Sequence, residues 1–136
     1  MSIPLDKQLK WVLVIVISFI VVLATMDWMK YISHYENMRK ISQSEEGVLA
    51  ANLSVYKKEI GVITPLNNRL IVDAITGKNA KNKVFIKRNE LRLNSHGEVI
   101  DPTGQPYIFS YSEGYPVVSS KSLGTSIRDV TGYYGN

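Results

Sequence analysis

Apolar residues are concentrated in one uninterrupted run near the N-terminus of this 136-residue chain. Residues 11–26 (WVLVIVISFIVVLATM) carry no charge, and only Ser18 and Thr25 among them are polar. A helix rises about 1.5 Å per residue, so the run spans about 24 Å, and Trp28–Met29 extend it towards the roughly 30 Å of a bilayer core. No other part of the chain offers an equally apolar partner surface, so the pattern predicts a transmembrane helix over residues 11–29.

The predicted membrane anchor consists of Trp11 and Trp28 at the two ends of the run, where the bilayer interface favours tryptophan, and of Ile17 and Val21 in its middle. Two lysines in the preceding segment, residues 1–10, favour a cytoplasmic N-terminus. Basic residues also follow the run (Lys30, Arg39 and Lys40), and they weaken this positive-inside argument.

A cleavable signal peptide is the alternative interpretation of the same run. Lys7 and Lys10 would form its positive region, residues 12–23 its apolar region, and Val22–Ala24 its cleavage site. Against cleavage, apolar residues continue past this point at helical spacing, three or four positions apart. They are Trp28, Ile32, Tyr35, Met38 and Ile41. The pattern therefore favours a retained anchor, and N-terminal processing stays open.

A helical stalk is predicted over residues 30–62. Residues 41–47 (ISQSEEG) interrupt its apolar face, and Ser42 with Glu45 has the spacing of a capping box, which allows a helix to restart after a kink. Apolar residues then resume at helical spacing, at Leu49, Leu53, Tyr56 and Ile60. We therefore expect one long helix, straight or bent, from Trp11 to about Ile60.

A short second helix is predicted directly after the stalk. Thr64 is its expected N-cap and Pro65 its first helical residue. Gly77 is placed to close it in a left-handed conformation. The residues expected to face inward are Leu66, Leu70, Ala74 and Ile75.

The remaining chain alternates between strand-like and turn-like segments. Residues 83–94 predict one long strand or two short ones, and Asp101-Pro102-Thr103-Gly104 carries the signals of a type I turn. The next strand is expected to place Tyr107, Phe109 and Tyr111 on one face. Glu113-Gly114 is a turn signal, and Pro116 suits an edge strand because proline cannot donate to a ladder.

The predicted fold class is α+β, with a long N-terminal membrane-spanning helix followed by a short helix and a small antiparallel sheet. The head is assigned to residues 63–124. Residues 119–136 are rich in Gly, Ser and Tyr, so a loop with a mobile end is expected there, with residues 125–136 as the C-terminal tail.

The net charge of +4 and the isoelectric point of about 9.3 reflect a local excess of basic residues. Between residues 57 and 92, nine basic side chains (Lys57, Lys58, Arg69, Lys78, Lys81, Lys83, Lys87, Arg88, Arg92) accompany three acidic ones (Glu59, Asp73, Glu90). Aromatic residues are sparse there, so a nucleic-acid surface, which needs stacking platforms, is disfavoured. Contacts with anionic lipid, acidic partner surfaces and plain solubility stay open as interpretations.

Sequence support for catalysis, a cofactor or a metal site is absent. The chain has no cysteine, and its two histidines, His34 and His96, occupy expected stalk and turn positions. Ser54 and Lys57 have the bare S-x-x-K spacing of some acyl-enzymes, but the companion motifs are missing, and Ser54 is expected on a solvated helix face. Gly77-Lys78 lacks the other residues of a phosphate loop. The chain is therefore predicted not to be an enzyme.

Residues 101–107 (DPTGQPY) resemble the Asp-Pro-Trp-Gly-x-Pro-Tyr turn of type II secretion pseudopilins related to the major pseudopilin, with Thr103 in place of the usual Trp. Residues 70–86 (LIVDAITGKNAKNKVFI) are similar to the family's passage from helix through Gly and Asn to a basic strand. Residues 118–124 are similar to its closing strand and loop. The resemblance covers residues 66–124 in detail, and it implies a structural turn formed by Asp101, Pro102, Gly104, Pro106 and Tyr107.

The resemblance further implies a non-enzymatic, membrane-anchored structural subunit of a type II secretion or type IV pilus-like assembly. Its location would be the bacterial inner membrane, with a single span and the head in the periplasm. The implied partners are membrane lipid and other pseudopilin-like subunits or inner-membrane assembly components, and a homo-oligomer is open.

The chain departs from the family pattern at two places. It lacks the Gly and the fifth-position Glu of a prepilin-peptidase site, and only Asp129 lies beyond Glu113 to supply a carboxylate to a calcium loop. The alternative function is therefore a stand-alone bitopic or secreted binding or adaptor domain. Such a domain would retain the head fold without polymerising.

Overall fold

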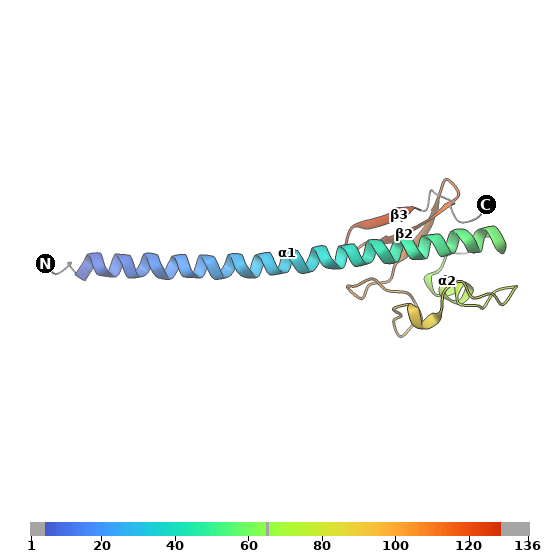
Figure 1. The fold of residues 1–136 in the computed structure, drawn as a ribbon, viewed down its shortest axis with the longest axis horizontal. Helices are drawn as coiled ribbons and strands as arrows, with labels where there is room; N and C mark the ends of the chain where they lie inside the picture. The colour runs from blue at the N-terminus through green and yellow to red at the C-terminus, as the bar shows by residue number, and fades with distance from the viewer. Residues whose placement is uncertain (1–4, 65, 129–136) are drawn as a thin grey trace. The chain divides into compact units, whose positions relative to one another are not determined.

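The structure is a computed structural model that describes residues 5–64 and 66–128 (Figure 1). Its elements are helix α1 (Leu5–Glu59), helix α2 (Asn68–Ile75), the 3₁₀ helix η1 (Arg88–Glu90) and the strands β1 (Ile108–Ser112), β2 (Tyr115–Ser120) and β3 (Thr125–Arg128). The predicted α+β layout is confirmed. The chain forms two compact units, Met1–Asn37 and Met38–Asn136, and α1 contributes to both.

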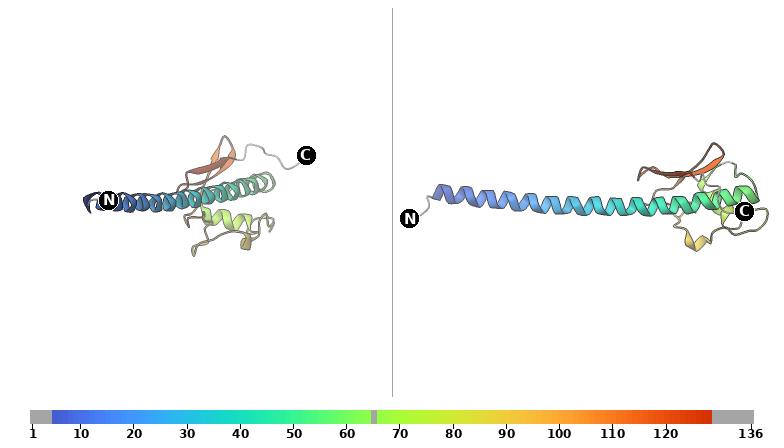
Figure 2. Two further views of the ribbon diagram at one scale, coloured as in Figure 1. Left: turned by 60° about the vertical axis from the view of Figure 1, so that its left-hand side comes forward. Right: turned by 45° about the horizontal axis from the view of Figure 1, so that its top comes forward.

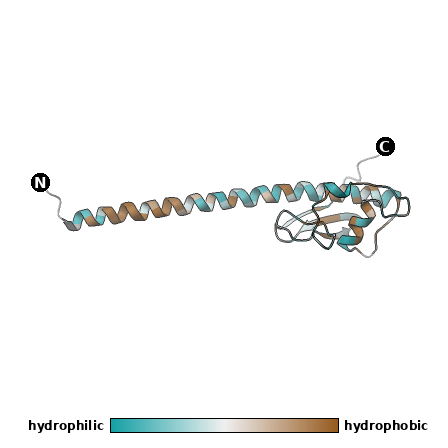
Figure 3. Cartoon of the chain, turned by 90° about the horizontal axis from the view of Figure 1, so that it is seen from below, coloured by the Kyte–Doolittle hydropathy of each residue, from teal (hydrophilic) through white to brown (hydrophobic). Residues whose placement is uncertain are grey.

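The first unit is the N-terminal part of α1, and its apolar run is the brown segment of Figure 3. The side chains of this run are exposed around the helix, for example Trp11 at 67% and Met26 at 46%. The two polar side chains in the run bond to the helix itself, since Ser18 Oγ donates to the Val14 carbonyl and Thr25 Oγ1 to the Val22 carbonyl, both at 2.8 Å. Within the described residues, α1 is thus one helix long and apolar enough to cross a membrane.

The long helix predicted from Trp11 to about Ile60 is confirmed, since α1 extends from Leu5 to Glu59 and residues 41–47 lie inside it. Ser42 does not form a capping box with Glu45. Its hydroxyl instead donates to Glu46 Oε1, one turn further on, at 3.0 Å. Both Ser42 and Glu46 are fully buried, so tertiary contacts in the second unit satisfy the polar side chains that interrupt the apolar face of the helix.

The second unit is a head built around the C-terminal half of α1. The three-stranded sheet and α2 lie on different sides of this helical segment in Figure 1 and in the left view of Figure 2. One apolar cluster joins them, made of Leu49, Ala50, Leu53 and Tyr56 from α1, Ile71, Val72, Ala74 and Ile75 from α2, and Val99, Tyr107, Phe109 and Val118 from the sheet side. The second half of α1 is therefore the central element of the core.

Helix α2 begins later than predicted, with Asn67 as its N-cap instead of Thr64, while Pro65 lies outside the described residues. The Asn67 side chain accepts hydrogen bonds from two backbone amides of the first turn, at 3.0 and 3.3 Å. The predicted inward position of Leu70 is wrong, since this side chain is 47% exposed and the next two residues, Ile71 and Val72, are buried instead. Ala74 and Ile75 are buried as predicted, and Leu66 is partly buried against the core.

The end of α2 at Gly77 is as predicted. Gly77 has a φ of 116°, its amide bonds to the Ala74 carbonyl at 3.4 Å, and the Lys78 amide bonds to the Asp73 carbonyl at 2.9 Å. This pair of hydrogen bonds is a Schellman motif, which favours glycine because the position needs a positive φ.

Residues 83–94 do not form the predicted strand or strands. The Phe85 and Ile86 amides bond to the carbonyl of Ile75 at the end of α2, at 2.9 and 3.3 Å, so they are used to satisfy a helix terminus and not a neighbouring strand. Within the described residues, η1 and one isolated bridge, Leu93 to Val99, are the only regular structure here.

The sheet is antiparallel, with the order β1-β2-β3. Glu113 and Gly114, at φ 52° and 82°, form the predicted turn, and Ser112 pairs with Tyr115 across it. The predicted alternation along β1 is confirmed, because Phe109 is buried and Tyr111 half-buried while their neighbours on the strand are exposed.

Two expectations about the sheet are wrong. Pro116 lies in the central strand and not in an edge strand. It is tolerated because its pair with Tyr111 is one position from the hairpin end, a register that needs no amide hydrogen bond, and because the described pairing with β3 starts at Val117. Residues 125–128, expected as tail, form β3 along Val117–Ser120. The sequence TSIR has one large apolar residue, so its strand character comes from this pairing.

Candidate functional site

The predicted turn at residues 101–104 is present and is built on a buried carboxylate. The Gly104 amide bonds to the Asp101 carbonyl at 2.9 Å, and Gly104 has a φ of 87°. Asp101 itself is 0% exposed. Its Oδ1 accepts hydrogen bonds from the Thr103 amide at 2.8 Å, from Thr103 Oγ1 at 2.6 Å and from the Gln105 amide at 3.1 Å. The carboxylate thus accepts hydrogen bonds from backbone amides of the turn, as a backbone carbonyl would in a longer turn.

The other oxygen of Asp101 binds the loop that follows β2. Asp101 Oδ2 accepts hydrogen bonds from the hydroxyls of Ser120 and Ser122. Burial acts to raise the pKa of the Asp101 carboxyl, but the hydrogen bonds from Ser120, Ser122 and Thr103 outweigh it and hold the pKa at about 2. An anion is therefore stabilised inside the head by uncharged donors.

A second buried carboxylate, Glu46, lies on α1 and is 0% exposed. Its Oε1 accepts hydrogen bonds from Ser42 Oγ at 3.0 Å, from the Ser120 amide at 3.1 Å and from the Thr125 hydroxyl. Its Oε2 is buried and has no hydrogen-bond partner among the described residues. Ser120 joins the two carboxylates, because its amide binds Glu46 while its hydroxyl binds Asp101.

Tyr107 extends this arrangement, which we call the carboxylate–hydroxyl network (Ser42, Glu45, Glu46, Asp101, Thr103, Tyr107, Ser120, Ser122, Thr125). The Tyr107 hydroxyl donates to Glu45 Oε2 at 2.7 Å and lies 3.2 Å from Ser42 Oγ. Burial raises the pKa of Tyr107 well above its ordinary value, and the neighbouring Glu45 raises it further. Tyr107 is therefore a neutral donor that connects the start of β1 to α1.

The network combines residues that the sequence singled out with residues that it did not. Asp101 and Tyr107 were predicted as turn residues. The structure bonds Asp101 to the end of β2 and the loop after it, and Tyr107 to α1. Pro102 is the second residue of the turn, and Pro106 forms an isolated bridge with Ile100. Ser42, Glu46, Ser120 and Thr125 were not predicted as partners. The available signal was that Ser42 and Glu46 share the helical phase of Leu49 and Leu53.

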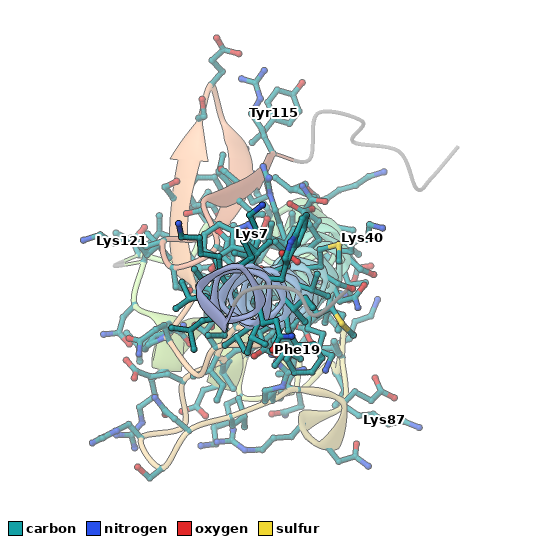
Figure 4. The ribbon with its side chains drawn as sticks, turned by 90° about the vertical axis from the view of Figure 1, so that its left-hand side faces the viewer. Lys7, Phe19, Lys40, Lys87, Tyr115 and Lys121 are labelled. Carbon is teal, nitrogen blue, oxygen red and sulfur yellow. The ribbon has the colours of Figure 1, made fainter. Side chains whose placement is uncertain are left out.

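The predicted membrane-anchor residues belong to the first unit. Trp11, Ile17, Val21 and Trp28 are 67%, 52%, 55% and 64% exposed, and the Trp28 ring lies 6.2 Å from that of Tyr31. Figure 4 looks along α1 from its N-terminal end and shows Phe19 pointing away from the helix in the same unit. Side chains of this kind require an apolar medium or apolar partners.

Most basic residues of the 57–92 segment contact acceptors of the head itself. Lys78 and Arg88 pair with Asp73 at 3.1 and 3.2 Å, while Lys83 pairs with Glu59 at 2.5 Å. Burial acts to raise the pKa of Asp73, but its two basic partners lower it below the ordinary value. Arg92 pairs with Glu45 at 3.1 Å. The basic residues are thus distributed among intramolecular pairs.

Lys57 is held between two parts of the head. Its Nζ donates to the Gly114 carbonyl in the β1–β2 turn and lies 5.7 Å from the centre of the Tyr111 ring. Ser54 does not lie on a solvated face, contrary to expectation, because its hydroxyl is buried without a hydrogen-bond partner among the described residues. The S-x-x-K spacing therefore does not place a lysine amine on the serine hydroxyl.

No group of three or more His, Cys, Asp or Glu side chains within the described residues is arranged to hold a metal ion, and Asp129 lies outside those residues. Comparison with protein-family models, with curated proteins and with solved structures finds no match for the chain. The carboxylates of Asp101 and Glu46 are buried and bound to hydroxyls and amides, an arrangement that fixes α1, the 101–104 turn and the last two strands to one another.

Proposed function

We propose that the chain is a non-enzymatic, membrane-anchored structural subunit of a type II secretion or type IV pilus-like assembly. The observation that carries this proposal is that one helix, α1, has two different environments. Its first part exposes a continuous apolar surface, and its second part is the central element of a compact head. The pseudopilin resemblance of residues 66–124 supports the same role.

The proposed location is the bacterial inner membrane, with residues 1–10 in the cytoplasm and the head in the periplasm. The length and composition of α1 support a single span. Lys7 and Lys10 before the apolar run support this orientation.

In the proposed mechanism, the two units have different roles. Apolar side chains of the first unit anchor the protein in lipid and pack against apolar helices of neighbouring subunits. The carboxylate–hydroxyl network keeps the head rigid, so that its surface presents a constant shape to other subunits. A hydrolytic role for Ser54 is not part of the proposal, and Ser54→Ala is expected to remove no activity.

Cysteine crosslinking in native membranes tests the assembly role, because the chain has no cysteine of its own. Cysteines introduced at Ile17 and Val21, one turn apart on α1, are expected to give ladders of self-adducts. The double variant Ile15→Cys, Phe19→Cys is the matched control, since these side chains are also one turn apart and exposed, at 64% and 63%, but lie on another face of the same helix. Ladders from the Ile17 and Val21 double variant that exceed those from this control support a filament.

The second candidate function is a stand-alone bitopic or secreted binding or adaptor domain. The missing prepilin-peptidase Gly and Glu favour it, since the usual route into a filament requires them. A single heteromeric band in the crosslinking experiment would support the adaptor. Mass spectrometry of the mature protein separates the bitopic from the secreted form, because a chain cleaved after Ala24 loses most of the apolar run.

A further inference from the structure

Four side chains on one side of α1 line a shallow depression at the start of the apolar run. They are Lys7, Lys10, Trp11 and Val14. Their spacing of three, four and seven residues places them on the same helical face. Trp11 is 67% exposed and Val14 is 52% exposed. A basic section, an aromatic section and an apolar section therefore follow one another along this face, all within the first unit of the chain.

This order of side chains matches the order of chemical groups in a phospholipid. A phosphodiester accepts hydrogen bonds from lysine ammonium groups, tryptophan favours the headgroup level, and acyl chains contact aliphatic side chains. The other end of the run differs, because Asp27 and Lys30 flank Trp28 there and their charges cancel. At the first end Asp6 accompanies two lysines, so residues 6–10 carry one net positive charge.

We propose that the face formed by Lys7, Lys10, Trp11 and Val14 binds a phospholipid with a net negative headgroup. The phosphate lies against the two ammonium groups, and one acyl chain follows Trp11 and Val14. This inference rests on the part of the proposed function that places α1 across a bilayer. It adds selectivity for anionic lipid at one end of the span.

The two tryptophans allow each end of the span to be measured separately. The full chain is reconstituted in vesicles of zwitterionic phosphatidylcholine with a minor fraction of anionic phosphatidylglycerol. The bromine quencher is attached either to the phosphatidylglycerol or to an equal amount of phosphatidylcholine, so that the surface charge is the same. A lysine near an anionic surface contributes about 1 kcal/mol, which equals an enrichment of about fivefold. Trp11, observed in a Trp28→Phe variant, should show a preference of this order for the brominated anionic lipid.

Four comparisons make the result specific. The double variant Lys7→Gln, Lys10→Gln should abolish the preference at Trp11, whereas Lys30→Gln should leave it unchanged. Trp28, observed in a Trp11→Phe variant, should be quenched equally by the two brominated lipids. Inorganic phosphate should weaken the preference no more than chloride does at equal ionic strength, because the occupant is a lipid and not the free anion.

Equal quenching of Trp11 by the two lipids, or an unchanged preference in the double lysine variant, overturns the inference while leaving the membrane span intact. A specific effect of inorganic phosphate overturns the lipid as occupant. If neither tryptophan is quenched by any brominated lipid, the span itself is absent, and the proposed function fails together with the inference. Failure of the two is therefore distinguishable.

Discussion

The two parts of α1 are made of the same secondary structure but meet opposite requirements. Over residues 11–26, apolar side chains cover the whole circumference and are exposed. Over residues 42–56, one apolar face is buried by α2 and the sheet, together with Ser42 and Glu46, while Val48 on another face is 49% exposed. The first part needs lipid or other helices to cover it, whereas the second part is covered by its own chain. Stability of the head should therefore depend on the second part alone.

The largest expected effect comes from the core position of this second part. Leu53→Ala removes a side chain that is 2% exposed and should lower the free energy of unfolding of the head by about 2–5 kcal/mol. Val16→Ala is the matched control in the first part, where Val16 is 51% exposed, and it should change head stability by less than about 0.5 kcal/mol.

Tyrosine near-ultraviolet circular dichroism during urea titration of the detergent-solubilised chain measures this comparison. It reports on the head because Tyr56 and Tyr107 are buried there, whereas Tyr31 of the first unit is 64% exposed. Equal destabilisation by the Leu53 and Val16 variants would contradict the assignment of stability to the second part of α1.

Acidification should weaken the head through Asp101. Its pKa is about 2 in the folded head, below the ordinary value of 3.8, so the folded carboxylate contributes stability that is fully present above about pH 4. This contribution is lost as the pH falls towards 2, and it amounts to about 2–3 kcal/mol. Urea titrations at a series of pH values should show the loss in the wild-type chain.

Asp101→Asn is the control for this pH dependence. The variant keeps the size of the side chain but has no carboxyl to titrate, so it should start less stable and lose less stability between pH 4 and pH 2. A pH dependence that is the same in both chains would assign the acid sensitivity to another group.

The link between β1 and α1 should have a smaller effect. Tyr107→Phe removes the hydroxyl that donates to Glu45 at 2.7 Å and lies against Ser42, while the buried ring is retained. The expected loss is about 1 kcal/mol in the same urea titration. Tyr115→Phe provides the control, because Tyr115 lies at the exposed end of the hairpin (Figure 4) and should tolerate the change. Similar losses in the two variants would argue against a structural role for the network.

Local patterns in the sequence were sufficient where the cause of a structure is itself local. The apolar run, the Gly77 helix end, the turn at residues 101–104 and the Glu113-Gly114 hairpin all follow from side chains within a few positions of one another. The alternation of Tyr107, Phe109 and Tyr111 predicted the buried face of the sheet for the same reason.

Tertiary contacts determine the secondary structure of the segments that the sequence did not predict. Residues 83–94 have strand-like composition, but the Phe85 and Ile86 amides donate hydrogen bonds to the Ile75 carbonyl at the end of α2. Residues 125–128 have weak strand character, yet β2 supplies a partner. In the sequence, Glu46 only interrupts the apolar face of a helix, and its hydrogen-bond partners Ser120 and Thr125 lie more than 70 positions away. Such long-range pairs leave no periodic signal in a single sequence.

The smallest expected effect concerns the surface of the head, where charge is shared among several pairs. Arg88→Gln removes one of two basic partners of Asp73, but Lys78 stays at 3.1 Å from the same carboxylate, so the loss should be below about 0.5 kcal/mol and should shrink further at high salt. Arg69→Gln gives a control on the same helix as Asp73, and urea titrations at low and high salt provide the measurement. If Arg88→Gln lowers the free energy of unfolding by more than about 1 kcal/mol, the Arg88–Asp73 pair does more than neutralise one carboxylate. It would then also hold the 83–94 segment in place. In that case the stability of the head would depend on ion pairs at its surface as well as on the buried face of α1.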